Sequence, residues 1–352
     1  MIDILKDILT YISGLYTLPW ILIGFIATII IAQFIGREKI DKIMKKIGLI
    51  ILYFFIPVLL FRIFLDLFRL KQINFALVTS LIILLMYLIA YYYAKKTAEK
   101  QKLTKSKKDL YLKTMLTNQG RSSAFIGSAM MAYWPVEAGI FMALVGIALF
   151  AIIPYILSHL HRKENKRKKQ HEEKNPLPWF LKIYPWYLIA FVIAAIIINL
   201  QTGIKTQDYG NIGFLLKFYT AITIPAALYY VGASIHPSDL KKSEMKKLIG
   251  LDKGKEDSEH WEWVRQMFIL TVIITPLIIA GIFTILLLTD RIPHIWYPVI
   301  IINAILPVTS TNMFLLPYGI DKKSTAHIVT WTTLVCVPIV VALIAVFGIY
   351  FT

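Results

Sequence analysis

Ten stretches of predominantly apolar residues follow one another along the chain, and they constrain the fold more than any other feature. A helix needs about 20 such residues to cross the hydrocarbon core of a bilayer. No stretch shows the alternating pattern of a barrel strand, which leaves helices as the spanning form. We therefore predict an all-α integral membrane protein with ten transmembrane helices, at approximately 17–35, 47–65, 73–93, 111–133, 139–158, 183–200, 212–234, 267–289, 296–318 and 326–350.

The composition agrees with a membrane protein, because 57% of the residues are hydrophobic and the mean hydropathy is +0.65. The single cysteine, Cys336, excludes a disulfide or a cysteine metal site within one chain. His159, His161 and His171 have no metal-like spacing with cysteines, so we predict no metal and no cofactor. The N-terminus lacks the features of a cleaved signal peptide, so we expect the first span to be a structural helix.

Basic residues alternate between the loops in a way that orients the chain. Of the 38 Lys and Arg, 29 lie in loops on one side of the predicted membrane, 5 lie on the other side and 4 lie inside spans. Cytoplasmic loops carry the excess of Lys and Arg, so both termini are expected outside a plasma or inner cell membrane. The basic run 161–174 is then a topogenic loop, and we expect no nucleic-acid partner.

The two halves of the chain resemble one another. Residues 19–27 (P-W-I-L-I-G-F-I-A) and 185–193 (P-W-Y-L-I-A-F-V-I) are identical at five of nine positions. Prolines in the second and fifth spans of each half also correspond, as Pro57 with Pro225 and Pro154 with Pro338. Because five is odd, a duplicated five-helix unit enters the membrane from opposite sides in its two copies, which gives inverted repeats.

These halves define the predicted domain organisation. The first repeat covers residues 1–160, a basic cytoplasmic linker covers 161–182, and the inverted second repeat covers 183–352. Inverted repeats in transporters place the substrate site where broken helices meet near the midplane of the bilayer. The fourth and ninth spans are the interrupted ones here, because each carries a polar run near its centre.

The polar runs supply the candidate substrate site. Freed backbone groups at membrane depth are tolerated only where protein or a water-filled cavity satisfies them, and Pro307 disrupts its helix by removing a donor. We therefore expect residues 118–123 and 307–312 to be non-helical and to approach one another near the midplane. The predicted substrate-binding residues are Asn118, Gln119, Gly120, Arg121 and Ser122 in the fourth span, and Asn303, Pro307, Thr309, Ser310, Thr311 and Asn312 in the ninth.

Charges inside the spans indicate the substrate. All 21 Asp and Glu lie outside the ten spans, whereas Arg62, Lys113, Arg121 and Lys217 lie inside them. Three of these cations lie near span ends, where long side chains reach the interface, but Arg121 lies near the centre. Two interpretations remain open. Arg121 either ties down the unwound backbone of the ninth span or pairs with a carboxylate of the substrate, bidentately where the geometry allows.

The motif N-Q-G in the fourth span and N-A-I-L-P-V-T-S-T-N-M-F-L-L-P-Y-G-I-D at 303–321 resemble the auxin efflux carrier family of permeases. That family belongs to a larger group that includes the bile acid sodium symporters. The resemblance implies a scaffold of spans 1, 2, 6 and 7, a transport domain of spans 3–5 and 8–10, and a homodimer. It also implies that a small organic anion is carried by an elevator motion. The chain departs from the pattern because no proline follows the Asn-x-Gly element.

Other functions fit the sequence less well. An intramembrane hydrolase requires a nucleophile with a base or paired aspartates, and no predicted span contains Asp or Glu. We therefore predict that the protein is not an enzyme. A membrane sensor normally carries a soluble signalling domain, and no loop of this chain is long enough for one. A channel requires a selectivity filter, and no motif here resembles one. The alternative within carriers is a sodium-coupled organic anion symporter, in which backbone and Asn oxygens would bind the sodium ion.

Overall fold

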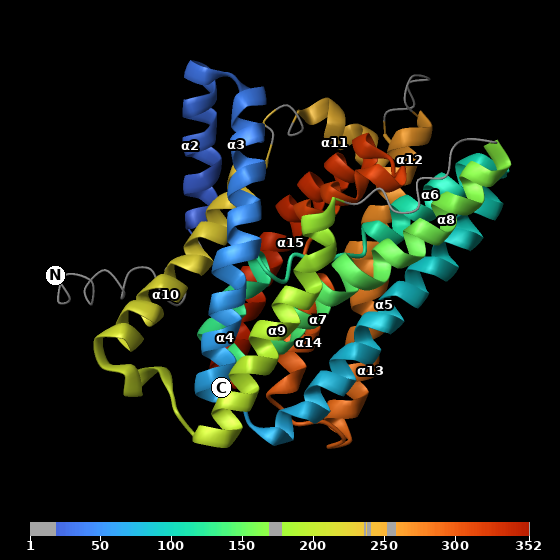
Figure 1. Ribbon diagram of the computed structural model, residues 1–352. Helices are drawn as coiled ribbons and strands as arrows, with labels where there is room; N and C mark the ends of the chain where they lie inside the picture. The colour runs from blue at the N-terminus through green and yellow to red at the C-terminus, as the bar shows by residue number, and fades with distance from the viewer. Residues whose placement is uncertain (1–18, 169–177, 236, 238–240, 252–257, 352) are drawn as a thin grey trace.

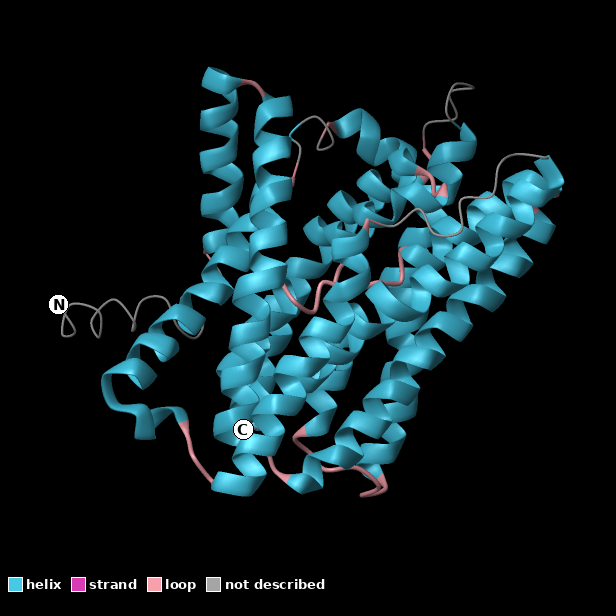
Figure 2. Ribbon diagram, in the orientation of Figure 1, coloured by secondary structure: helices cyan, strands magenta, loops and turns pink. Residues whose placement is uncertain are grey.

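The computed structural model describes residues 19–168, 178–235, 237, 241–251 and 258–351. Residues 17 and 18 of the first predicted span and residues 169–177 of the predicted linker, with His171, lie outside the described residues. All regular elements within the described ranges are helical, apart from one isolated β-bridge (Figure 2). The prediction of an all-helical chain is therefore confirmed.

Seven helices among the described residues have the length and apolarity needed to cross a membrane. They are Arg37–Leu67, Leu70–Lys100, Pro135–Arg162, Trp179–Thr202, Thr206–Ala233, Glu259–Leu288 and Lys322–Tyr350. Two shorter apolar helices, Trp20–Ile35 and Trp296–Ile305, lie among them. These lengths agree with a membrane-embedded protein. The count of ten spans and the inverted repeat stay predictions.

One group of helices lies on the left and in the centre of Figure 1. It comprises α2 (Trp20–Ile35), α3 (Arg37–Ile50) with its continuation α4 (Ile56–Leu67), α9 (Trp179–Thr202) and α10 (Gly210–Ala233). Within this group α10 packs on α2, and α4 packs on both α9 and α10. Glycines allow the close contact of α2 with α10. A Cβ on Gly24 would lie 2.2 Å from the Tyr229 carbonyl oxygen, and one on Gly232 would lie 1.8 Å from that of Ile21.

The second group lies on the right and at the back of the first. Within this group α5 packs on α6, α12 packs on α15, and α13 packs on α14. The bounds are α5 (Ile73–Lys100), α6 (Lys105–Thr117), α7 (Pro135–Ile147), α8 (Ile153–Lys168), α12 (Ser258–Phe268), α13 (Thr275–Leu288), α14 (Trp296–Ile305) and α15 (Lys322–Tyr350). A short surface helix, α11 (Lys242–Ile249), packs on α12.

Three of the long helices contain a π-helical turn directly before a proline. The turns Ile51–Phe55, Ala148–Ile152 and Ile269–Ile274 precede Pro57, Pro154 and Pro276. A proline lacks the amide donor and its ring clashes with the carbonyl four residues earlier, and the wider turn relieves both effects. Pro225 and Pro338 lie inside α10 and α15 without such a turn. The paired prolines of the two halves therefore differ in local backbone structure.

Several helices are longer than the predicted spans. The expected basic loop between the first two spans is almost entirely helical, because α3 begins at Arg37 and only Gly36, with φ +82°, separates it from α2. Helix α5 likewise runs to Lys100 rather than ending at residue 93. These extensions carry Lys and Arg, so they correct the predicted loop boundaries while keeping the basic residues at one end of the bundle (Figure 1).

Candidate functional site

The fourth and ninth predicted spans are both interrupted in the structure. Helix α6 ends at Thr117, and a short 3₁₀ helix, η4 (Ile126–Ala132), follows an irregular segment. Helix α14 ends at Ile305, and the chain resumes as the 3₁₀ helix η9 (Ser310–Tyr318). The non-helical part of the ninth span is therefore shorter than predicted, because residues 310–312 begin η9. Figure 2 shows non-helical segments inside the molecule as well as at its two ends.

The two interrupted segments pair with one another as a minimal antiparallel ladder. The Ser122 amide donates to the Pro307 carbonyl at 2.9 Å, and the Thr309 amide donates to the Gly120 carbonyl at 2.9 Å. Arg121 and Val308 form the bridge between these bonds. The pairing satisfies backbone groups that the broken helices release, as an apolar environment requires. The prediction that the two segments approach each other is confirmed.

Arg121 lies at the centre of this crossing and is 2% exposed. Its Nη1 atom donates to the Leu306 carbonyl at 3.2 Å, on the opposite segment. The Nε and Nη2 atoms are buried without a hydrogen-bond partner among the described residues. Both interpretations of Arg121 therefore have a structural counterpart, since one donor holds the ninth span and two donors are left for another group.

Asparagines on both sides of the crossing connect it to α15. Asn118 donates to the Thr114 carbonyl at 2.9 Å and to Thr325 Oγ1 at 3.2 Å, and it accepts from Asn312 Nδ2 at 3.5 Å. The Asn312 Oδ1 atom and both polar atoms of Gln119 are buried without a partner in the described part of the chain. A Cβ on Gly120 would lie 2.6 Å from Asn312 Oδ1, so only glycine fits there without displacement.

The remaining predicted residues lie around the same crossing. Asn303 accepts from Ser123 Oγ at 3.1 Å and donates to the Val299 carbonyl at 2.8 Å, which ties the end of α14 to the fourth span. Thr309 and Thr311 hydroxyls lie 2.9 Å apart. All eleven predicted site residues therefore belong to, or directly flank, the two paired segments.

Two small cavities lie on either side of the crossing. One of about 20 Å³ is lined by Arg121, Thr309 and Thr311 together with Ile56 of α4 and Leu188 of α9. The other, of about 10 Å³, is lined by residues that include Ser122, Ser310 and Val231 of α10. Each has room for about one water molecule. Neither of these two cavities has room for an organic anion.

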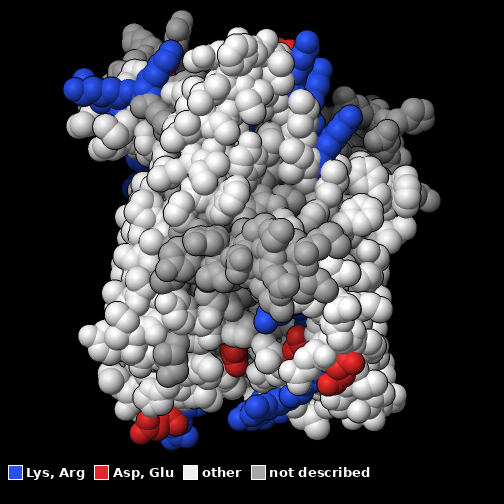
Figure 3. Space-filling view, turned by 90° about the vertical axis from the view of Figure 1, so that its left-hand side faces the viewer, with Lys and Arg blue, Asp and Glu red and all other residues white. Residues whose placement is uncertain are grey.

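A much larger cavity, of about 950 Å³, lies between α4, α10 and η4. Arg62 and Asp66 of α4, Lys205 before the short helix η6 (Thr206–Tyr209) and Lys217 of α10 line it. Figure 3 views the molecule from the left-hand side of Figure 1, and it shows basic and acidic side chains together around a hollow in the lower part. Sequence reasoning assigned Arg62 and Lys217 to the membrane interface and missed the cavity, because its walls come from segments about 140 residues apart.

Two charged residues lie elsewhere than predicted. Lys113 does not reach an interface, because it is 1% exposed and its Nζ atom donates to the Tyr318 carbonyl at 3.0 Å, at the end of η9. A cation at a helix C-terminus is electrostatically favourable. Glu137 lies inside α7 and is 6% exposed, since that helix begins at Pro135 rather than at residue 139. It accepts from Gln72 Nε2 at 3.5 Å.

His327 contacts another histidine near the start of α15. Its Nδ1 atom lies 3.0 Å from His260 Nε2, and His260 Nδ1 lies 3.0 Å from Ser324 Oγ. Asp321 caps α15 by accepting from the Ser324 amide at 2.6 Å. Within the described ranges no group of three or more His, Cys, Asp and Glu is arranged to hold a metal ion. The histidine pair therefore belongs to a hydrogen-bonded network at the start of α15.

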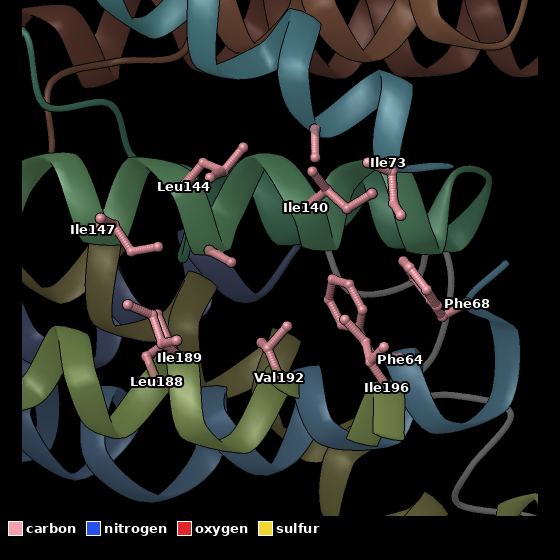
Figure 4. Close-up of a pocket in the computed structure, with 12 residues that line it drawn as sticks. Phe64, Phe68, Ile73, Ile140, Leu144, Ile147, Leu188, Ile189, Val192 and Ile196 are labelled. Carbon is pink, nitrogen blue, oxygen red and sulfur yellow. The ribbon is translucent and has the colours of Figure 1, made fainter. Parts of the chain in front are cut away.

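An apolar cavity of about 210 Å³ lies between the two groups of helices, where α7 also contacts α4 and α9. Figure 4 shows Ile147 of α7 pointing toward Leu188 and Ile189 of α9, which lie on the opposite side of the cavity. Phe64 of α4 and Ile73 of α5 close its end. All its lining residues are apolar, so contact between the two groups there involves no side-chain hydrogen bonds.

Comparisons of the chain with protein-family models, with curated proteins and with solved structures found no match.

Proposed function

We propose that the chain is a secondary transporter that moves a small organic anion of the carboxylate type across the membrane. The observation that carries this proposal is Arg121, a buried guanidinium at the crossing of two broken helices with two donors left unpaired. An arginine is charged at any accessible pH, and a planar fork of donors matches a carboxylate. A substrate anion at Nε and Nη2 would satisfy both donors and neutralise the charge.

The proposal includes ten spans arranged as two inverted five-helix repeats. The scaffold would be α2, α3 with α4, α9 and α10, and the transport domain would contain the remaining long helices with both broken segments. Contacts within each group support this division, as do the small cavities at the crossing that face α4, α9 and α10. The apolar cavity between α7 and α9 supports an elevator motion, because sliding there breaks no polar contact.

Membership of the auxin efflux carrier family belongs to the same proposal and rests on the sequence motifs. The homodimer through the scaffold helices rests on that resemblance as well. Large apolar side chains on the outer faces of α2 and α9, such as Leu22, Phe34 and Trp186, would contact lipid or the partner subunit.

A sodium-coupled organic anion symporter is the second candidate. The unpaired oxygens Asn312 Oδ1 and Gln119 Oε1 favour it, because hard cations bind amide and carbonyl oxygens. In that case a sodium ion would bind these two oxygens while the substrate anion binds Arg121.

Uptake by purified protein in proteoliposomes tests these proposals. A panel of mono- and dicarboxylates is offered with no gradient, with a proton gradient and with a sodium gradient, and empty liposomes provide the background. We expect saturable uptake of at least one carboxylate that is lost in Arg121→Gln. Dependence on a sodium gradient would select the symporter. Absence of uptake of every anion under all three conditions would contradict the proposed function.

A further inference from the structure

The large cavity between α4 and α10 lies at the end of the molecule opposite the basic loops. Its lining includes Lys205 and Thr206 from the connection of α9 to α10, together with the last turns of α4. Figure 1 shows this connection at the lower end, whereas α11 and the turn between α2 and α3 lie at the upper end. The volume of about 950 Å³ is in the range of small-molecule binding sites.

Positive charge is concentrated in this cavity against the trend of the sequence. Of the 38 Lys and Arg, 9 lie outside the loops on the predicted cytoplasmic side, and three of these nine, Arg62, Lys205 and Lys217, line this cavity. Among the described residues that line it, Asp66 is the only acidic one, so these residues together carry a net charge of about +2 at neutral pH. A cleft with walls of one sign attracts ligands of opposite charge.

The acidic residue has a structural role that leaves the cations facing the cavity. Asp66 accepts from the Thr206 amide at 2.7 Å, which fixes the short helix η6 to the end of α4. Gly213 of α10 lies against the Thr206 carbonyl, where a Cβ would lie 1.8 Å from the oxygen. Arg62 is half-buried, and its Nε atom is buried without a hydrogen-bond partner among the described residues. Asp66 therefore holds the connection of α9 to α10 against the end of α4, and it accepts no hydrogen bond from Arg62 Nε.

The inner end of the cavity reaches the broken fourth span. Ala129, Met131 and Ala132, all in η4, line it opposite Thr220 and Ile224 of α10. This helix follows directly on the segment that carries Arg121. An anion in the cavity would therefore lie between solvent at the lower end and the second half of the broken helix.

We propose that this cavity is an anion-binding vestibule for the substrate, and that Arg62, Lys205 and Lys217 select small organic dianions such as dicarboxylates over monocarboxylates. The inference rests on the proposed transport function and adds the substrate class and a first binding site. Cations on two facing walls, on α4 and on α10, match a ligand with two separated negative groups. Binding there would raise the local concentration of substrate without requiring the crossing to open.

Kinetic constants for uptake of succinate and of acetate test the vestibule. Arg62→Gln and Lys217→Gln are each expected to raise KM for succinate up to about fivefold, since exposed charge pairs contribute up to about 1 kcal/mol. The double variant should raise KM by more than tenfold, leave kcat within twofold and weaken the dependence of KM on salt. Arg291→Gln is the matched control, because it is exposed at the same end and does not line the cavity.

The outcomes separate the vestibule from the transport function. Unchanged KM in Lys217→Gln and in the double variant, with uptake lost in Arg121→Gln, would overturn the vestibule and leave the transporter. If wild-type protein takes up no anion, titration of the purified protein with succinate decides. Binding that is weakened in the Arg62 and Lys217 variants but not in Arg291→Gln supports the vestibule alone, and absence of succinate binding overturns it.

Discussion

Replacement of Arg121 by glutamine is expected to abolish anion binding without lowering the stability of the protein. The substitution removes one charge-assisted hydrogen bond, from Nη1 to the Leu306 carbonyl, which contributes about 1.5–3 kcal/mol. It also removes the desolvation cost of a guanidinium that is 2% exposed, an effective penalty of several kcal/mol per ion. The two terms oppose each other, so the free energy of unfolding should stay unchanged or rise.

The effect on binding should be much larger than the effect on stability. Loss of the partner of a buried charge costs about 2–5 kcal/mol, which corresponds to a weakening of about 30-fold or more. Arg121→Lys should restore binding only in part, because an ammonium group lacks the planar fork of donors.

Melting temperature and anion affinity are measured on the same purified variants. Lys113→Met is a matched control, because Lys113 is also a buried cation that donates to a carbonyl of the second half, at Tyr318. We expect Lys113→Met to affect the melting temperature more than the affinity. An Arg121→Gln protein that melts several degrees lower, and loses affinity only in proportion, would show that Arg121 is structural. Normal affinity in that variant would refute its role in the anion site.

Three further outcomes are expected. Gly120→Ala should destabilise the protein by about 1–3 kcal/mol and impair uptake, because its Cβ would lie 2.6 Å from Asn312 Oδ1; an unchanged melting temperature would contradict this packing. Cysteines at Gly146 and Leu188, where a Cβ on Gly146 would lie 3.2 Å from Leu188 Cδ2, should block uptake when bridged by a short bifunctional reagent, and each single variant is the control. Uptake that persists after bridging would argue against the elevator. From outside intact cells, an impermeant thiol reagent should label Arg291→Cys and not Lys105→Cys, and the reverse labelling would invert the topology.

The positions of the membrane helices and of their breaks could be predicted because their signals are local. Apolar runs about 20 residues long, the polar run at 118–123 and Pro307 each act through neighbouring residues, so they can be identified without a partner. The structure interrupts both spans at these positions, after Thr117 and after Ile305. The likeness of the two halves also predicted that the breaks lie together, since inverted repeats bring equivalent spans to one crossing.

Helix ends were less predictable, because apolarity and helicity end at different residues. Helix α3 begins at Arg37 and α5 ends at Lys100, since intrahelical hydrogen bonds continue outside the apolar stretch. The sequence shows where each apolar stretch leaves the hydrocarbon core of the bilayer. Its signal for the residue at which the helix ends is weaker.

Only the tertiary structure decided how distant charges are used. The bonds from Ser122 to Pro307 and from Lys113 to Tyr318 join residues 185 and 205 positions apart, and no local pattern specifies either one. Lys113 and Lys217 have similar positions near predicted span ends, yet the first is buried against a carbonyl and the second is exposed in a cavity. Sequence determines that a cation lies in an apolar segment, but its partner depends on which segments pack against it, because burial and hydrogen bonding are properties of the assembled helices.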